Sequence, residues 1–194
     1  MRFALLPAAL LSLCLAVGCA PRYELQLVSY KDPYFPETLQ LSPSDCAWRQ
    51  EHGGDIHIVA RSSDLVGEPP VAVEQYLHAR LFWRPRPGKT PVDSGTINAN
   101  LRFIVMTKSG VSEYEGTGFV FVKKFEHAKP ADVRLESSAL KPVRTSGTAP
   151  ELFGEIRLTG RMKAAADEST ALDLVRRAEV REAGVEGARG QGAE

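Results

Sequence analysis

The sequence predicts an all-β protein, an antiparallel β-sandwich of about seven to eight strands followed by one short C-terminal helix. Three observations predict this fold. Apolar and polar residues alternate with a period of two in most segments between residues 23 and 163, Gly and Pro interrupt these segments, and a helical period begins only after Ala164. A sandwich is expected because each sheet has to bury its apolar face against another, and a closed barrel is the alternative.

The expected strands follow one another with turns between them. They are residues 23–27, 56–61, 76–84, 97–105, 111–125, 133–140 and 154–163. The segment 111–125 is apolar on both faces around Phe119 and Val120, which predicts a central strand. Gly116 and Gly118 within it predict a bulge or a close backbone contact, because the strand continues where a dinucleotide-binding loop would turn into a helix.

The period changes near the carboxyl end of the chain. Residues 166–183 are expected to form the helix, with Asp167 or Thr170 as its cap. Its apolar positions and its expected i,i+4 ion pair are Ala171, Leu174, Val175 and Ala178, and Asp173 with Arg177. Residues 184–194 are rich in Gly and charge and have nothing to bury, so they are expected to be disordered.

The amino terminus has the composition of a secretory signal peptide. Arg2 is followed by residues 3–17, which carry no charge. This apolar run is shorter than the roughly 20 residues that a helix needs to cross a bilayer. Residues 1–18 are therefore expected to be a cleaved signal, and residues 23–165 are expected to form the β domain.

The motif Ala16-Val17-Gly18-Cys19 resembles the lipobox of bacterial lipoproteins, in which Leu, a small or β-branched residue, and Gly or Ala precede an invariant Cys. The resemblance covers only the signal region, and Ala16 stands where the family usually has Leu. It implies a lipid anchor at Cys19, with a diacylglyceryl group on the sulfur and palmitate-like acylation of the new amino end, and residues 19–22 as the tether. It also implies a place in the cell envelope, and Ala20, where inner-membrane lipoproteins often have Asp, favours the outer membrane facing the periplasm. An ordinary signal peptide, cut for example after Ala20, is the alternative.

Composition excludes some classes of partner. The chain has 24 basic and 24 acidic side chains, whereas nucleic-acid binders usually show a basic excess, so nucleic acid is not an expected partner. Cys14 would leave with the signal and Cys19 would carry lipid, which leaves Cys46 without a partner for an intrachain disulfide. Cys46 is expected to be buried as a small hydrophobic residue.

The sequence predicts no catalytic, metal or cofactor site. His52, Asp55 and His57 lie close together, but their spacing is not a known ligand signature, and surface histidines are expected. No Gly-x-Ser-x-Gly nucleophile motif occurs, and the carboxylates are scattered. The protein is therefore expected not to be an enzyme.

Two loops are candidates for molecular recognition. Trp83, Arg84, Arg86 and Lys89 lie among prolines and form the predicted partner-binding set, because Trp and Arg are enriched at interaction hot spots and Pro lowers the entropy cost of ordering. A plain hairpin connection, with Trp83 in the core as its strand parity indicates, is the alternative for this segment. Residues 32–36 contain two adjacent aromatic side chains, which are expected to pack as part of a loop. Contact with a membrane or a carbohydrate is the alternative for these aromatics.

These features predict a lipid-anchored, non-enzymatic envelope lipoprotein that acts as a binding or structural module, with recognition by loops on a rigid β scaffold. The expected partners are the membrane, through the lipid anchor, and an envelope protein or cell-wall component. One alternative is a small-ligand carrier with an apolar cavity inside a barrel. The other is an envelope hydrolase, in which His57 or His78 would meet a carboxylate or hydroxyl in a cleft.

Overall fold

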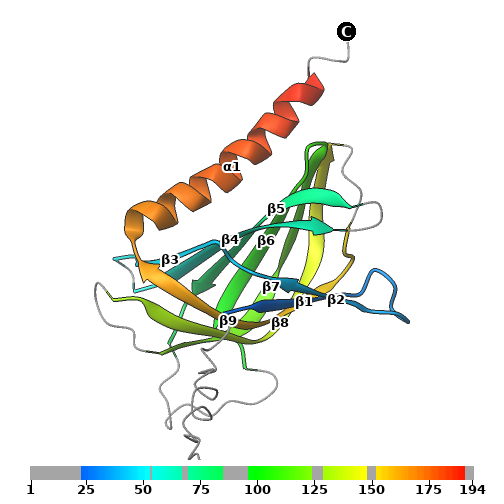
Figure 1. Cartoon of the computed structure of the whole chain (residues 1–194). Coiled ribbons are helices and arrows are strands. Elements are labelled where there is room, and N and C mark those ends of the chain that lie inside the picture. The colour runs from blue at the N-terminus through cyan, green and yellow to red at the C-terminus, as the bar shows by residue number, and fades with distance from the viewer. Residues whose placement is uncertain are drawn as a thin grey trace, which may run out of the picture.

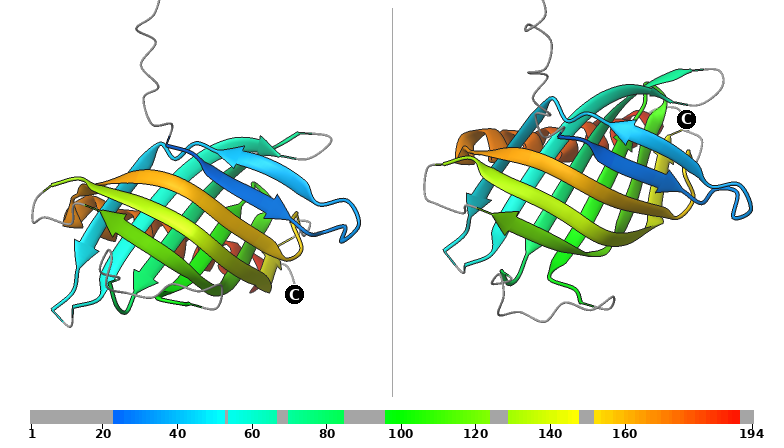
Figure 2. Two further views of the ribbon diagram at one scale, coloured as in Figure 1. Left: turned by 90° about the horizontal axis from the view of Figure 1, so that it is seen from below. Right: turned by 60° about the horizontal axis from the view of Figure 1, so that its bottom comes forward.

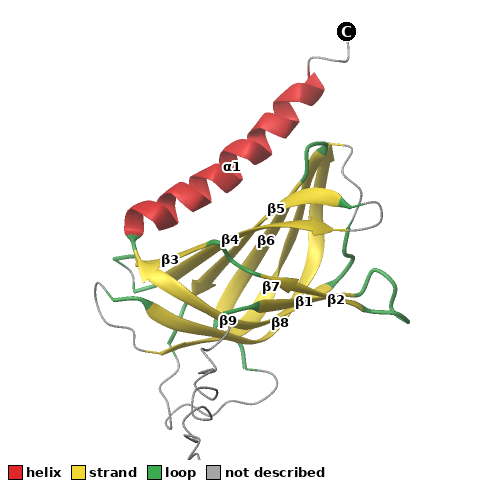
Figure 3. Ribbon diagram, in the orientation of Figure 1, coloured by secondary structure: helices red, strands yellow, loops and turns green. Residues whose placement is uncertain are grey.

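The part of the protein that the structure describes consists of one curled β-sheet and one helix. The computed structural model describes residues 23–52, 54–66, 70–84, 96–123, 129–147 and 152–190. The elements are β1 (Leu25–Ser29), β2 (Glu37–Leu41), β3 (Asp45–Gln50), β4 (Ile56–Val66), β5 (Val71–Leu81), β6 (Ala99–Met106), β7 (Gly110–Lys123), β8 (Ala131–Gly147), β9 (Ile156–Ala166) and α1 (Glu168–Gly190). Figures 1 and 3 show the strands wrapped around a common axis, with α1 on one side.

The nine strands form a single mixed sheet in the order β2-β1-β9-β3-β4-β5-β6-β7-β8, and a further pairing of β8 with β9 curls it into a near-closed ring. β9 is the strand at which the ring closes, because it pairs with β8 along one edge and with both β1 and β3 along the other. Within the described residues, only the short β3–β9 pairing, at Ala47 and Trp48, is parallel. The sheet therefore forks at β9, with the β1–β2 hairpin on one branch and β3 on the other.

The inner face of the ring is the main hydrophobic core. Alternate residues of the strands point inward, and the largest of these side chains include Phe103, Tyr114, Leu27 and Leu135, together with Phe153 from the segment before β9. The rings of Phe103 and Phe153 each lie 6.2 Å from that of Tyr114, so aromatic side chains fill the interior. The period-two alternation in the sequence thus identifies the inward-facing residues.

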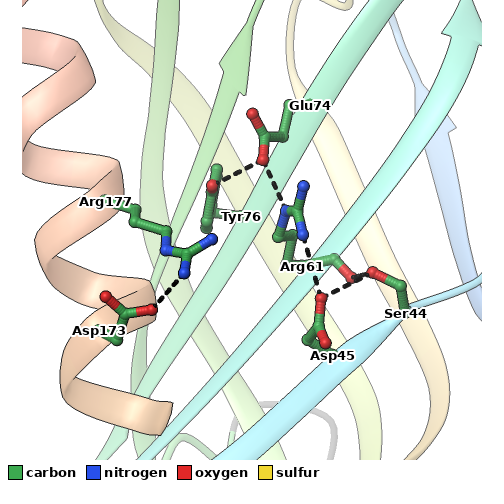
Figure 4. A network of polar contacts seen from close by, with 7 residues as sticks. All are labelled: Ser44, Asp45, Arg61, Glu74, Tyr76, Asp173 and Arg177. Atoms are coloured by element: carbon green, nitrogen blue, oxygen red, sulfur yellow. Dashed lines mark hydrogen bonds and ion pairs between the residues drawn. The ribbon is translucent and has the colours of Figure 1, made fainter.

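A second apolar cluster lies outside the ring, where α1 packs on the sheet. Val59, Tyr76 and Ile104 face outward from β4, β5 and β6, and Leu174 and Ala178 of α1 cover them. A polar network borders this patch (Figure 4): Arg61 binds Glu74 at 2.6 Å and Asp45 at 3.2 Å, and the Tyr76 hydroxyl donates to Glu74 at 2.8 Å. The apolar strip under the helix is therefore bounded by charged residues, which limits where α1 can dock.

The start of α1 follows from its cap. Asp167 accepts hydrogen bonds from the Thr170 amide at 2.9 Å and the Thr170 hydroxyl at 2.7 Å. These bonds hold the pKa of Asp167 well below its usual range. The predicted Asp173–Arg177 pair is present at 2.7 Å (Figure 4), and the predicted cap and apolar face are confirmed. The helix extends to Gly190, beyond the expected end at residue 183 and into the segment expected to be disordered.

The mostly-β class and the C-terminal helix are confirmed, but the two-sheet sandwich is wrong. One sheet buries its own apolar face by curling, which is closer to the barrel alternative. The long strands make this possible, because twist accumulates along strands such as β7 and β8, which are also bulged. The sequence pattern missed β2 and β3, which are short and lie on either side of Pro43.

A bulge in β8 is the main irregularity of the ring. Between Leu135 and Leu140 the strand bows away from β9. Ser138 bridges the resulting gap: its Oγ donates to the Leu158 carbonyl at 2.7 Å and accepts from the Leu158 amide at 2.6 Å. On the other side β8 presses on β7, where a Cβ on Gly116 would lie 1.9 Å from the Ala139 carbonyl oxygen. The predicted close backbone contact at the β7 glycines is confirmed.

Replacing Ser138 by Ala is expected to lower the free energy of unfolding by about 2 to 3 kcal/mol, because two buried backbone groups of Leu158 lose their partner. Chemical denaturation measures the change. Ser137→Ala, at the neighbouring exposed position, is the matched control and should stay within about 0.5 kcal/mol of the wild type. Equal effects of the two substitutions would contradict the bridging role.

Candidate functional site: a groove at the bulge of β8

The predicted partner-binding residues are only partly within the described structure. Arg86, Lys89 and the predicted lipidation site Cys19 lie outside the described residues. Trp83 follows β5, and its indole Nε1 donates to the Ile97 carbonyl at 3.1 Å while its ring lies 6.2 Å from that of Phe119. Trp83 therefore fastens the two ends of the 84–96 connection to the sheet, and Arg84 stands exposed where that connection begins.

The root of this connection borders a groove on the outer face of the ring. The groove has a volume of about 470 Å³ and runs over the bulge of β8 between β7 and β9. We call it the hydroxyl groove; its lining residues are Thr96, Ile97, Thr117, Gly118, Glu136, Ser137, Ser138, Ala139, Arg157 and Thr159. It is hollow because β8 bows outward there and because its floor consists of small residues such as Gly118 and Ala139.

Two buried polar side chains, Asn98 and Ser138, stabilise the backbone that forms the walls of the groove. The Asn98 side chain accepts a hydrogen bond from the Val120 amide at 2.7 Å and donates to the Val120 carbonyl at 2.8 Å. It thus takes the place of a strand partner where the β7 register shifts between Phe119 and Val120. Ser138 does the same for Leu158 across the groove. Both residues are buried, so the walls are built from satisfied backbone.

The charge in the groove is balanced. Arg157 stacks on Tyr30, with its Cζ 5.3 Å from the ring centroid, and Glu136 pairs with Arg134 at 3.2 Å. The hydroxyls of Thr96, Thr117 and Thr159 can both donate and accept hydrogen bonds. The groove can therefore hydrogen-bond a polar chain, such as a peptide backbone or a glycan, without a strong preference for either sign of charge.

A row of titratable side chains crosses the outer face of the ring from β3 to β7; we call it the histidine row. His57 Nε2 lies 3.3 Å from Glu51 Oε1, and His57 Nδ1 lies 3.0 Å from His78 Nε2. Glu51 also accepts from Arg49 at 2.6 Å. Arg102 follows on β6 opposite His78 and binds Glu113. His57 is only 6% exposed, so the expectation of surface histidines is wrong for this residue.

Burial keeps both imidazoles of the histidine row neutral at neutral pH. It lowers the pKa of His78 to about 4, with the neighbouring His57 as the next cause, and it also lowers the pKa of His57. The hydrogen bond from Arg49 is the main cause that lowers the pKa of Glu51, and the neighbouring His57 adds to this effect. A neutral pair can share one N–H···N hydrogen bond at 3.0 Å, whereas two imidazolium rings would repel each other.

The sequence could not reveal this row, because it depends on which residues face each other across strands. The register sets Arg49 opposite His57, and His78 opposite Arg102. The only signal in the sequence was that both histidines occupy the polar, outward-facing positions of their alternating strands. The other cluster named from the sequence is not assembled: His52 is exposed, and Asp55 pairs with Arg80 at 2.8 Å.

Cys46 lies on β3 and is partly buried against the core cluster. Burial raises the pKa of its thiol to about 12, so the thiol is protonated at neutral pH. Within the described ranges, no three His, Cys, Asp or Glu side chains gather as ligands for a metal ion. In the same part of the chain, no helix is both long and apolar enough to cross a membrane.

Acidification is expected to destabilise the protein through His78. Its pKa is near 4 when folded and about 6.5 when unfolded, so between these values the unfolded chain binds more protons and stability falls as the pH falls. From pH 7 to pH 5 the free energy of unfolding should drop by about 2 kcal/mol through this group alone. In His78→Gln this drop should be largely absent, whereas His52→Gln should behave as the wild type. Denaturation at a series of pH values measures both, and an unchanged slope in His78→Gln would refute the assignment.

The chain has no match among protein-family models, curated proteins or solved structures.

Proposed function

We propose that the protein is a lipid-anchored lipoprotein of the cell envelope, placed at the outer membrane facing the periplasm, and that it binds another envelope component without catalysing a reaction. The observation that carries the binding role is the hydroxyl groove at the root of the 84–96 connection. Of the partner-binding residues predicted from the sequence, Trp83 contacts Ile97 at the edge of this groove, and Arg84 follows it in the chain.

The anchor rests on the amino-terminal sequence. A chain cleaved before Cys19 would leave residues 20–22 between the acylated Cys19 and Tyr23, so the Cα atoms of residues 19 and 23 would lie at most about 14 Å apart. One acyl chain holds a protein only marginally, whereas two or three on one residue make a stable anchor. A domain tethered this closely would stay at the membrane surface, where envelope partners are concentrated.

The chemistry of the groove supports an extended polar partner, such as a segment of an envelope protein or a cell-wall glycan. Hydroxyl groups line the groove, the residues of its floor have small side chains, and the groove is open to solvent. The stiff, tryptophan-anchored root of the 84–96 connection provides a rigid rim, which reduces the entropy cost of binding. Loops on a rigid β scaffold are frequent sites of recognition.

The two alternative functions have less support. A small-ligand carrier needs an apolar cavity inside the ring, where Phe103, Tyr114 and Phe153 pack instead. A hydrolase needs an accessible base, and the Glu51–His57 contact supplies a carboxylate beside an imidazole. That imidazole is nearly enclosed, and its other nitrogen faces His78 rather than a nucleophile.

Mass spectrometry of the amino-terminal peptide of the protein from its native membrane tests the anchor. We expect a peptide that begins at Cys19 and carries a diacylglyceryl group and an acylated amine. Cys19→Ala should abolish the modification and release the protein into a carbonate wash, whereas Cys46→Ala should change neither. Recovery of an unmodified thiol at residue 19 would refute the anchor.

Filling the groove tests the binding role. Ala139→Trp places a large side chain on the floor of the hydroxyl groove and should lower partner capture by crosslinking in intact cells at least about tenfold, since occluding a central contact typically costs 1.4 kcal/mol or more. Ala72→Trp, at an exposed position of β5, is the control. Equal thermal stability would show that both variants fold. Undiminished capture by Ala139→Trp would exclude the groove as the binding surface.

A further inference from the structure

Two aromatic side chains project from the tip of the β1–β2 hairpin. Tyr34 is 87% exposed and Phe35 is 76% exposed, so the packed loop expected from the sequence is wrong. The tip is nevertheless ordered locally: Asp32 accepts from the Tyr34 amide at 2.9 Å through its side chain and from the Phe35 amide at 3.3 Å through its carbonyl. Prolines at positions 33 and 36 stiffen it further. The fold thus holds two apolar rings out in solvent.

The opposite end of β1 carries positive charge. A groove of about 220 Å³ lies there, lined by Tyr23, Lys123, Asp132, Val133, Arg134, Arg161 and Met162; we call it the cationic groove. Its three basic side chains are exposed, and they outnumber the one carboxylate, Asp132, which accepts a long 3.4 Å hydrogen bond from Tyr23. Arg134 also pairs with Glu136 at 3.2 Å. The groove therefore suits an anionic group such as a phosphate.

The register between β1 and β9 places the tip and the cationic groove at opposite ends of one strip. Ser29 pairs with Ile156 near the tip, and Leu25 pairs with Gly160 near the cationic groove. In both views of Figure 2 this strip, with β1, β9 and β8, lies in front, and α1 lies behind the ring. The chain before Tyr23, which includes the apolar residues 3–17, joins the strip beside the cationic groove.

We propose that the β1–β2 side of the ring rests on the surface of a bilayer that contains anionic lipids. Tyr34 and Phe35 enter the headgroup region at one end, and the cationic groove binds lipid phosphate at the other. Aromatic side chains favour this depth of the membrane, and basic residues gain from the negative surface potential. This inference rests on the proposed lipid anchor, which would bring the strip to the membrane.

The proposed recognition surface borders this strip. The hydroxyl groove begins on β9, at Arg157 and Thr159 beside β1, and opens over β8 and β7. β6, just before which Ile97 accepts a hydrogen bond from Trp83, is separated from β1 by β9, β8 and β7 in the sheet. A bilayer against the β1–β2 hairpin would therefore lie along the β9 edge of the groove, and the partner would reach the groove from the β7 side.

Fluorescence quenching by brominated lipids tests the contact of the tip. The acylated protein carrying Phe35→Trp is reconstituted into vesicles of mixed anionic and zwitterionic lipids, and its emission is compared with that of the wild type, which contributes Trp48 and Trp83. We expect the added tryptophan to be quenched. Leu172→Trp, on α1 at the far side of the ring, is the control and should not be quenched.

A charge-neutralising pair tests the cationic groove. Lys123→Gln with Arg161→Gln should lower the equilibrium constant for docking on anionic vesicles about twenty-five-fold, because each basic residue contributes about fivefold. Removing the same charge elsewhere, with Lys108→Gln and Arg176→Gln, should have little effect. Equal quenching of Phe35→Trp in the two double variants would overturn the role of the groove.

Flotation of the vesicles separates this inference from the proposed function. Protein that floats with the vesicles while the tryptophan at position 35 stays unquenched would overturn the inference and leave the anchor standing. If the protein from its native membrane carries no acyl groups, the anchor is refuted. In that case anionic vesicles are added to the unacylated protein, and quenching of the tryptophan at position 35 still decides the inference. Crosslinks from position 35 in cells to protein rather than to lipid would also overturn it.

Discussion

The structure depends on the pairing of β9 along both of its edges. β8 occupies one edge, and β1 and then β3 occupy the other, so the two branches of the sheet meet on a single strand. The helix α1 packs on the outer face of the sheet, so the inner apolar face is buried by curling of the sheet, which closes at β9. Where β8 bows out, the Ser138 side chain replaces the missing backbone partners of Leu158, and the ladder of hydrogen bonds remains satisfied. Without the closure at β9, the interior aromatic cluster would face solvent.

The same closure creates both surfaces to which we assign a role. The bulge that lets β8 pass around the ring also hollows its outer face, and this produces the hydroxyl groove. The pairing of β1 with β9 brings the start of the domain, the cationic groove and the aromatic hairpin tip onto one strip. The helix α1 covers the opposite side (Figure 2), so the ring has one wall that is covered and one that is open.

Polar rows on the outer face determine where the helix lies. Leu174 and Ala178 need an apolar surface, and Val59, Tyr76 and Ile104 provide it. The Arg61–Glu74 pair borders this surface on one side, and the histidine row crosses the same strands near it. The histidines can be buried because they are neutral and hydrogen-bonded to each other, whereas a buried charge would need a partner. This arrangement explains two enclosed histidines without assigning them catalysis.

The sequence by itself determined the β class, most of the strands and the cap and ion pair of α1, because alternation, capping and i,i+4 spacing are local properties. It also located the close contact of the β7 glycines, since a Gly inside a strand usually marks a bulge or a place where another backbone comes close. Only the tertiary structure decided that one sheet curls on itself, because alternation shows which face is buried but not against what. The His57–His78 contact depends on strand register, and the exposure of Tyr34 and Phe35 depends on where the hairpin points. Neither property is encoded in a short stretch of sequence, because both arise from the pairing of strands that are distant in the chain.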